Sequence, residues 1–271
     1  RTFIGNSINR INPIDVSAFR RPGAEIKEGL IPVNMLFASQ GLTNQLTVEG
    51  FYQLEWDQTV LDNCGTFFGG DVAADGCTDN YTVGSPAIRP LQPVAAAFGQ
   101  GFGVTDEGVI VRRAADRDAR DSGQFGMALR WLGDDTEYGL YFMNYHSRTP
   151  TVGTLTANTN LATIGNIINT ANGIAPGSGA GLAQSVMLGR GQYYLDYPED
   201  IRLYGASFST TLPTGTAWTG EISYRPNAPV QLNTTDLTLA LVNPIAGNTV
   251  SPIRSSFGAD NTGYRRKEIT Q

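Results

Sequence analysis

Lysine, histidine and cysteine are scarce in this chain of 271 residues, and long hydrophobic runs are missing. Charged residues make up 16% of the sequence, below the roughly 25% of typical soluble domains, so a fully solvated surface is difficult to build. No segment approaches the ~18 consecutive apolar residues of a membrane-spanning helix. Glycine and proline interrupt every stretch and exclude a coiled coil, and the scattered aromatic residues argue against disorder. An all-β protein is the class that remains.

The charge balance is acidic, with a net charge of -6 and a pI near 4.8. No basic face is large enough to follow a phosphate backbone, so nucleic acid is not expected as a partner. Apart from Lys27 and Lys267, the 19 basic residues are arginines, which suit fixed hydrogen-bonded geometry. The chain starts without an initiator Met and stops inside an expected strand, so we expect a segment of a longer polypeptide. A missing targeting signal therefore says nothing about location.

Alternating apolar and polar residues predict pairs of strands joined by tight polar turns. The three predicted hairpins span residues 32–56, 123–146 and 200–224. In the first of them Val48 and Tyr52 lie on one face, and Glu49 and Gln53 lie on the other. This period of two holds for about eleven residues, longer than the usual strand of a globular sheet.

Long connections separate the hairpins, at residues 57–122, 147–199 and 226–263. Short turns on one side and long loops on the other are typical of a transmembrane β-barrel with short periplasmic turns and long extracellular loops. Aromatic residues near strand ends fit an interfacial girdle: Trp56, Trp131, Tyr138, Trp218 and Tyr224. We therefore expect an antiparallel transmembrane β-barrel, as a segment of a larger barrel. A soluble β-sandwich or β-solenoid with a dry core is the alternative.

Polar residues at alternate strand positions are candidates for lining a water-filled lumen and selecting the solute that passes through it. They are Glu49, Gln53, Glu55, Arg130, Glu221 and Arg225. A second set consists of arginines in the N-terminal segment and just before the second hairpin. These constriction candidates are Arg20, Arg21, Arg112, Arg113, Arg117 and Arg120. Facing rows of arginine and carboxylate would set a transverse field that selects solutes. The alternatives are a self-neutralising surface loop and, for residues 10–27, an ordinary connecting turn.

Several long motifs resemble the proteobacterial family called domain of unknown function 1302. The matching stretches are residues 10–30, 49–56 (EGFYQLEW), 59–68 (TVLDNCGTFF), 121–126 (DSGQFG) and 223–231 (SYRPNAPVQ). The resemblance implies the central part of a Gram-negative outer-membrane β-barrel of about twice this length. It also implies genomic association with lipoprotein-like partners and lipid-type export pumps of the envelope, and hence handling of lipids or other hydrophobic molecules. It assigns no activity.

Cys64 and Cys77 are an even pair in the first long loop, which predicts a disulfide in an exported protein. Asp71, Asp75 and Asp79 surround the pair and are weak calcium candidates, because their spacing is not that of an EF-hand. The interpretation that we favour is a solvated loop in which these carboxylates repel one another. We expect no metal and no cofactor.

The function that we expect is an outer-membrane channel or conduit for a small hydrophobic or amphipathic solute or a lipid. Apolar residues at helical spacing in 161–168 and 182–188 would line a vestibule for that solute, or simply cap the barrel. The first alternative is a non-conducting scaffold that anchors a surface or envelope complex through its loops. A less favoured alternative is an outer-membrane hydrolase. His146 is the single histidine, and the sequence has no nucleophile elbow. A catalytic serine, for example Ser147 or Ser207, would have to be brought to His146 by the fold. We therefore expect no enzyme activity.

Overall fold

The computed structural model describes residues 11–70, 72–84, 88–98 and 102–271. Most of the secondary structure is β, and the largest sheet has seven antiparallel strands in the order β1-β2-β6-β7-β10-β11-β13. The strands are β1 (Met35–Gly41), β2 (Leu46–Gln53), β6 (Phe125–Leu132), β7 (Thr136–Tyr145), β10 (Ile201–Thr211), β11 (Ala217–Gln231) and β13 (Tyr264–Thr270). Among the described strands the sheet is open, with β1 and β13 at its edges.

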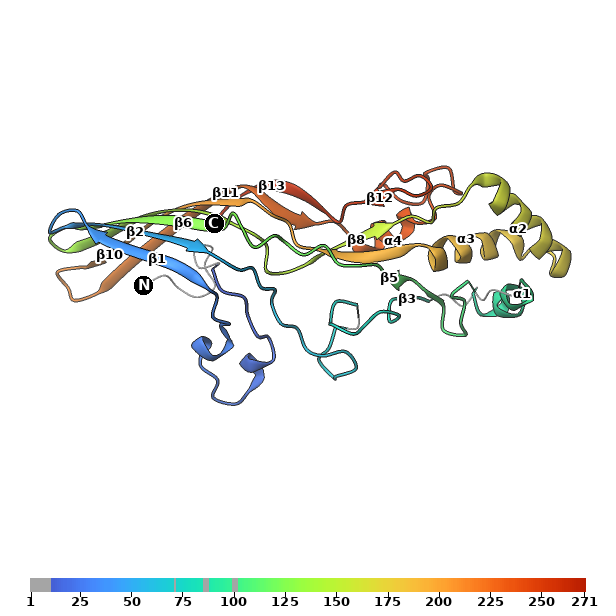
Figure 1. The fold of residues 1–271 in the computed structure, drawn as a ribbon, viewed down its shortest axis with the longest axis horizontal. Helices are drawn as coiled ribbons and strands as arrows, with labels where there is room; N and C mark the ends of the chain where they lie inside the picture. The colour runs from blue at the N-terminus through green and yellow to red at the C-terminus, as the bar shows by residue number, and fades with distance from the viewer. Residues whose placement is uncertain (1–10, 71, 85–87, 99–101) are drawn as a thin grey trace.

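The three predicted hairpins are the pairs β1–β2, β6–β7 and β10–β11. Their turns are short and lie together at one end of the sheet, and the long connections leave from the other end (Figure 1). Strand β11 runs beyond the predicted end at residue 224, because it changes partner there. Residues 217–224 pair with β10, and residues 224–231 pair with β13.

The strand register gives the seven-stranded sheet two different faces. Cross-strand neighbours on the first, which we call the apolar face, form one aliphatic row between two rows rich in aromatic residues. The aliphatic row is Val48, Leu129, Leu140, Ala206 and Ile222. The row nearer the turns holds Leu46, Trp131, Tyr138, Phe208 and Gly220, and the row nearer the loops holds Gly50, Met127, Phe142, Tyr204 and Tyr224. The opposite side, the polar face, includes the row Thr47, Arg130, Gly139, Ser207 and Glu221.

The long connections fold into a second body, which we call the loop body, at the loop end of the sheet (Figure 1). It contains a four-stranded sheet in the order β12-β8-β9-β5 and the two-stranded pair β3–β4. These strands are β3 (Thr82–Val83), β4 (Val109–Ile110), β5 (Arg112–Arg113), β8 (Thr151–Leu155), β9 (Gln192–Asp196) and β12 (Asp260–Asn261). The β5–β9 pair of the four-stranded sheet is parallel, and its β8–β9 and β12–β8 pairs are antiparallel.

Helices complete the loop body and carry its main apolar core. They are η3 (Arg89–Leu91), α1 (Gln92–Ala97), α2 (Leu161–Ile174), α3 (Gly179–Arg190) and α4 (Thr234–Ala240), and two further 3-10 turns, η1 (Ala18–Arg20) and η2 (Ile26–Gly29), precede the first strand. The two apolar segments of the third connection form α2 and α3. Asn160 is the N-cap of α2, and its side chain accepts a hydrogen bond from Thr163 N at 2.9 Å. Buried residues of α3 such as Leu182 and Met187 pack in this core. Among the described helices, none combines the length and the apolar character needed to cross a bilayer.

Candidate solute-binding face

Five of the six predicted lumen residues lie on the polar face of the seven-stranded sheet. Register places these five on one side: Glu49, Gln53, Arg130, Glu221 and Arg225. Glu55 is the exception, because β2 ends at Gln53, and the exposed Glu55 carboxylate instead accepts a hydrogen bond from Asn34 at 2.8 Å. The period of two thus correctly groups the strand residues, and their role in selecting a solute stays a prediction.

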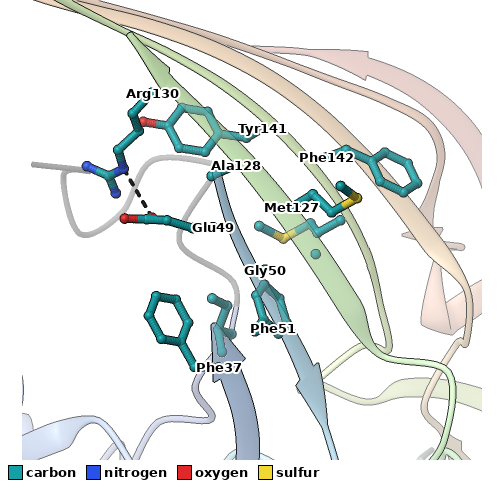
Figure 2. Close-up of a pocket in the computed structure, with 12 residues that line it drawn as sticks. Phe37, Glu49, Gly50, Phe51, Met127, Ala128, Arg130, Tyr141 and Phe142 are labelled. Carbon is teal, nitrogen blue, oxygen red and sulfur yellow. Dashed lines mark hydrogen bonds and ion pairs between the residues drawn. The ribbon is translucent and has the colours of Figure 1, made fainter. Parts of the chain in front are cut away.

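An ion pair between Glu49 and Arg130 forms the charged centre of the polar face. Arg130 Nε lies 3.1 Å from Glu49 Oε2, and Arg130 Nη1 lies 3.4 Å from Glu137 Oε1. Beside the pair is a pocket of about 150 Å³ whose apolar lining includes Phe37 and Phe51 (Figure 2). A charged pair next to aromatic side chains offers both polar and apolar contacts to a ligand.

Two glycines allow aromatic rings to lie flat on the polar face. A Cβ at Gly126 would come within 2.4 Å of the Phe51 ring, and a Cβ at Gly139 would come within 2.3 Å of the Tyr141 hydroxyl. Tyr141 in turn shares a hydrogen bond of 3.1 Å with Ser207 Oγ. Small residues are therefore needed at both positions to let a backbone and a ring approach closely.

The loop end of the polar face holds a second arginine, Arg148, which the sequence analysis did not select. Its guanidinium donates hydrogen bonds to the Gln53 side chain at 2.7 Å and to the carbonyls of Ile11 and Asp57 at 3.1 and 2.7 Å. Burial lowers the pKa of Arg148 to about 10, and the Asp57 charge acts in the opposite direction. The group is therefore still cationic at neutral pH. It lines a second pocket of about 270 Å³ that it shares with Arg225.

The predicted constriction arginines do not line either of these pockets. Five of them form ion pairs with carboxylates, and Arg21 is exposed. The partners are Asp62 for Arg20, Asp79 for Arg112, Asp116 for Arg113, Asp260 for Arg117, and Glu199 with Asp200 for Arg120. The loop that carries η1 and η2, with Arg20, hangs away from the seven-stranded sheet (Figure 1). A role for these arginines in solute selection stays a prediction.

Arg120 anchors a polar network that joins the loop body to the sheet. Arg120 Nη2 lies 2.7 Å from Asp200 Oδ1, and this hydrogen bond lowers the pKa of the Asp200 carboxyl. Asp200 has a positive φ of 56°, and its backbone N–H donates to Nδ1 of the fully buried His146 at 3.0 Å. The other ring nitrogen of His146 lies 3.0 Å from the Ser122 carbonyl. Backbone groups thus engage both ring nitrogens of His146, which fixes the junction between β7 and β10.

The two serines considered as partners of His146 bond elsewhere. Ser147 Oγ donates to the Thr149 carbonyl at 2.7 Å, and Ser207 Oγ lies beside the Tyr141 hydroxyl. No hydrogen bond between a described serine side chain and the imidazole is present. The expectation that the protein is not an enzyme stays a prediction.

Cys64 and Cys77 form the predicted disulfide, with their Cα atoms 5.6 Å apart. Of the weak calcium candidates, Asp71 lies outside the described residues, and Asp79 lies 3.9 Å from Arg112. Across the described ranges, no group of three or more histidine, cysteine, aspartate or glutamate side chains is placed to hold a metal ion.

We expect a Cys64→Ala, Cys77→Ala double variant to lose about 3 kcal/mol of unfolding free energy, because the bond closes a loop of 13 residues in sequence separation. Guanidinium titration measures this loss as the difference between the oxidised wild-type protein and the variant. The curve of the reduced wild-type protein should coincide with that of the variant. An oxidised wild-type protein no more stable than the variant would contradict the expectation.

The fold and its two faces define the class: a predominantly antiparallel β protein with one apolar and one polar sheet face and a body of structured loops at one end. The chain belongs to the family described as protein of unknown function (DUF1302), whose family model matches residues 1–271, the whole chain. No curated protein and no solved structure matches it.

Proposed function

We propose that the seven-stranded sheet is part of the wall of a β-barrel in the outer membrane of a Gram-negative bacterium, and that the barrel is a conduit for a hydrophobic or amphipathic solute. The apolar face would contact lipid, and the polar face would line the interior. The observation that carries this proposal is the aliphatic row between two aromatic-rich rows, opposite a face with paired charges.

Exposure of the apolar face supports its contact with lipid. Leu140 is 57% exposed and Ile222 is 56% exposed, although both lie in the middle of paired strands. Exposed apolar surface of this extent is unfavourable in water and is characteristic of an interaction site. The flanking rows contribute Trp131 stacked on Tyr138 with ring centroids 5.4 Å apart, as expected where strands leave the hydrocarbon region.

The polar face supports a conduit because its charges are paired and lie beside apolar side chains. The Glu49–Arg130 pair borders the pocket that contains Phe37 and Phe51. Such a surface favours a solute with both apolar and polar parts over a simple ion.

A second candidate function, a non-conducting scaffold, is supported by the segment of residues 11–34, which precedes β1. Gln53 Nε2 donates to the Ile11 carbonyl at 3.0 Å, so the segment at Ile11 lies at the loop end of the polar face. Ile11 also lines the pocket beside Glu49. If this segment blocked the interior of the barrel, the loop body would be the surface that binds partners, such as an envelope lipoprotein or an export pump.

Planar-bilayer recording of the full polypeptide that contains this chain separates the two candidates. A conduit should give stable ohmic steps, and the Arg130→Gln variant should raise the cation-to-anion permeability ratio about twofold or more, since Glu49 and Glu137 lose their counter-ion. Arg202→Gln removes the same charge from the apolar side of β10 and is the control. No conductance from protein shown to be folded and inserted would reject the open conduit in favour of the scaffold.

A further inference from the structure

The pocket shared by Arg148 and Arg225 differs from the rest of the polar face in its charge. We call it the arginine pocket; it has a volume of about 270 Å³, and its lining includes Asn12, Tyr145, Arg148, Ile201, Arg225 and Ile269. Both arginines are only 8% exposed. None of the described residues that line the pocket is acidic.

A change in strand pairing creates the space for this pocket. Pairing of β11 with β10 stops at Tyr224, and the register with β13 shifts between Arg225 and Ala228. The Asn227 side chain bridges the gap, accepting from Arg202 N at 2.9 Å and donating to the Asp200 carbonyl at 2.7 Å. A bulge of this kind redirects side chains and often occurs beside functional sites.

Neither guanidinium in the arginine pocket has an anionic hydrogen-bond partner among the described residues, and the Asp57 charge acts on Arg148 only from beyond ion-pair distance. The hydrogen bonds of Arg148 go to neutral oxygens, and Arg225 Nη2 donates to the side-chain oxygen of Gln271 at 2.6 Å. The Nε atoms of both arginines are buried without a hydrogen-bond partner. The ion pairs formed among the described residues include neither group. Buried charges without counter-ions are costly, and a bound oxyanion would relieve that cost.

Apolar side chains form the other part of the lining. Tyr145 and Ile201 are buried at the loop ends of β7 and β10, and Ile269 lies opposite Arg225 on β13. Ile14, Ala228 and Pro229 also belong to this part. A small inorganic ion would use the arginines and leave the apolar part in contact with water. A ligand with a charged head and an apolar chain would use both.

We propose that the arginine pocket binds the oxyanion head group, carboxylate or phosphate, of an amphipathic solute whose chain lies along the apolar lining. Each guanidinium has an Nε–H without a protein partner, and arginine binds carboxylate and phosphate through strong, charge-assisted hydrogen bonds. The proposal rests on the proposed function in that it assigns the chemical class of the solute.

Isothermal titration calorimetry of the full polypeptide in nanodiscs of zwitterionic lipid tests this proposal, with empty nanodiscs as the blank for partitioning. The probes are dodecanoate, dodecyl phosphate, the neutral 1-dodecanol and acetate. We expect one or both of the anionic amphiphiles to bind at least tenfold more tightly than dodecanol and than acetate, and the stronger of the two identifies the head group. Equal affinity for dodecanol, or for acetate, would overturn the proposal.

The Arg225→Gln variant locates the binding site. We expect it to weaken binding of the preferred anion about tenfold and to leave dodecanol unchanged, because it removes one of the two cations. Arg202→Gln, on the other face of the neighbouring strand, should leave both affinities unchanged. Unchanged anion binding in Arg225→Gln would overturn the proposal. If this variant fails to fold, the wild-type comparison of anion, alcohol and acetate still decides.

Bilayer recording of the same preparations separates this inference from the proposed function. Ohmic conductance without preferential binding of an anionic amphiphile would reject the arginine pocket and retain the conduit. Anion binding that Arg225→Gln weakens, in a protein that gives no conductance, would retain the pocket and reject the open conduit.

Discussion

Leu129→Arg is expected to lower the free energy of folding into a phospholipid bilayer by about 2–4 kcal/mol, whereas Ala128→Arg, one residue earlier, should cost less than about 1 kcal/mol. Leu129 lies in the aliphatic row, directly between Val48 and Leu140, and an arginine there would have to enter hydrocarbon. Ala128 points to the polar face and lies opposite Glu49. An arginine at Ala128 would therefore meet a carboxylate.

Guanidinium titrations of both variants in lipid vesicles measure the difference. The pair is well matched, since both substitutions introduce the same side chain into the same strand, β6, at adjacent positions. In a water-exposed sheet both arginines would be tolerated, because charged side chains are favourable on a solvated surface. Equal costs at the two positions would contradict the assignment of faces and, with it, the proposed contact with lipid.

Strand pairing within the three hairpins was predictable because it depends on short-range signals. Alternation in residues 46–53 and the turn before Leu46 specify both the β1–β2 pair and the face on which each side chain lies. The same rule places Arg130 and Glu221 in one row, although three strand boundaries lie between them. Local periodicity therefore accounts for most of the seven-stranded sheet and for the composition of its polar face.

The structure of the long connections was not predictable in the same way, since their contacts join residues that are far apart in sequence. Arg117 pairs with Asp260, 143 residues away, and no pattern near Arg117 indicates that partner. The same limit applies to Arg148, which binds Ile11 across 137 residues. A lone arginine after a strand gives no sign in the sequence that it will be buried, so the arginine pocket could not be predicted from sequence patterns.

Trp56 differs from Trp131 and Trp218, because it is buried. An aromatic residue just past a strand is expected at a membrane interface, and that expectation is wrong for Trp56. It is 9% exposed and packs edge-on against Tyr197, with ring centroids 4.8 Å apart. Its Nε1 donates to the Ser147 carbonyl at 3.1 Å. Trp131 and Trp218, by contrast, are 49% and 57% exposed on the apolar face, where the girdle was expected.

Trp56→Ala is accordingly expected to lower the unfolding free energy by about 3–5 kcal/mol, through a cavity among Ala119, Leu195 and Tyr197 and the loss of the bond to Ser147. Trp56→Phe should cost about 1–2 kcal/mol, since it retains a ring but leaves the Ser147 carbonyl without its donor.

The control for this prediction is Trp131→Ala, which deletes the same side chain from the exposed apolar face. In detergent we expect it to cost about 1 kcal/mol or less, because exposed positions lose little packing. Guanidinium unfolding followed by far-ultraviolet circular dichroism avoids the change in tryptophan fluorescence. Limited proteolysis should also cut the Trp56→Ala protein faster between residues 57 and 122, since Trp56 joins the end of β2 to the loop body. Equal stability of the two alanine variants would mean that Trp56 does not hold this junction.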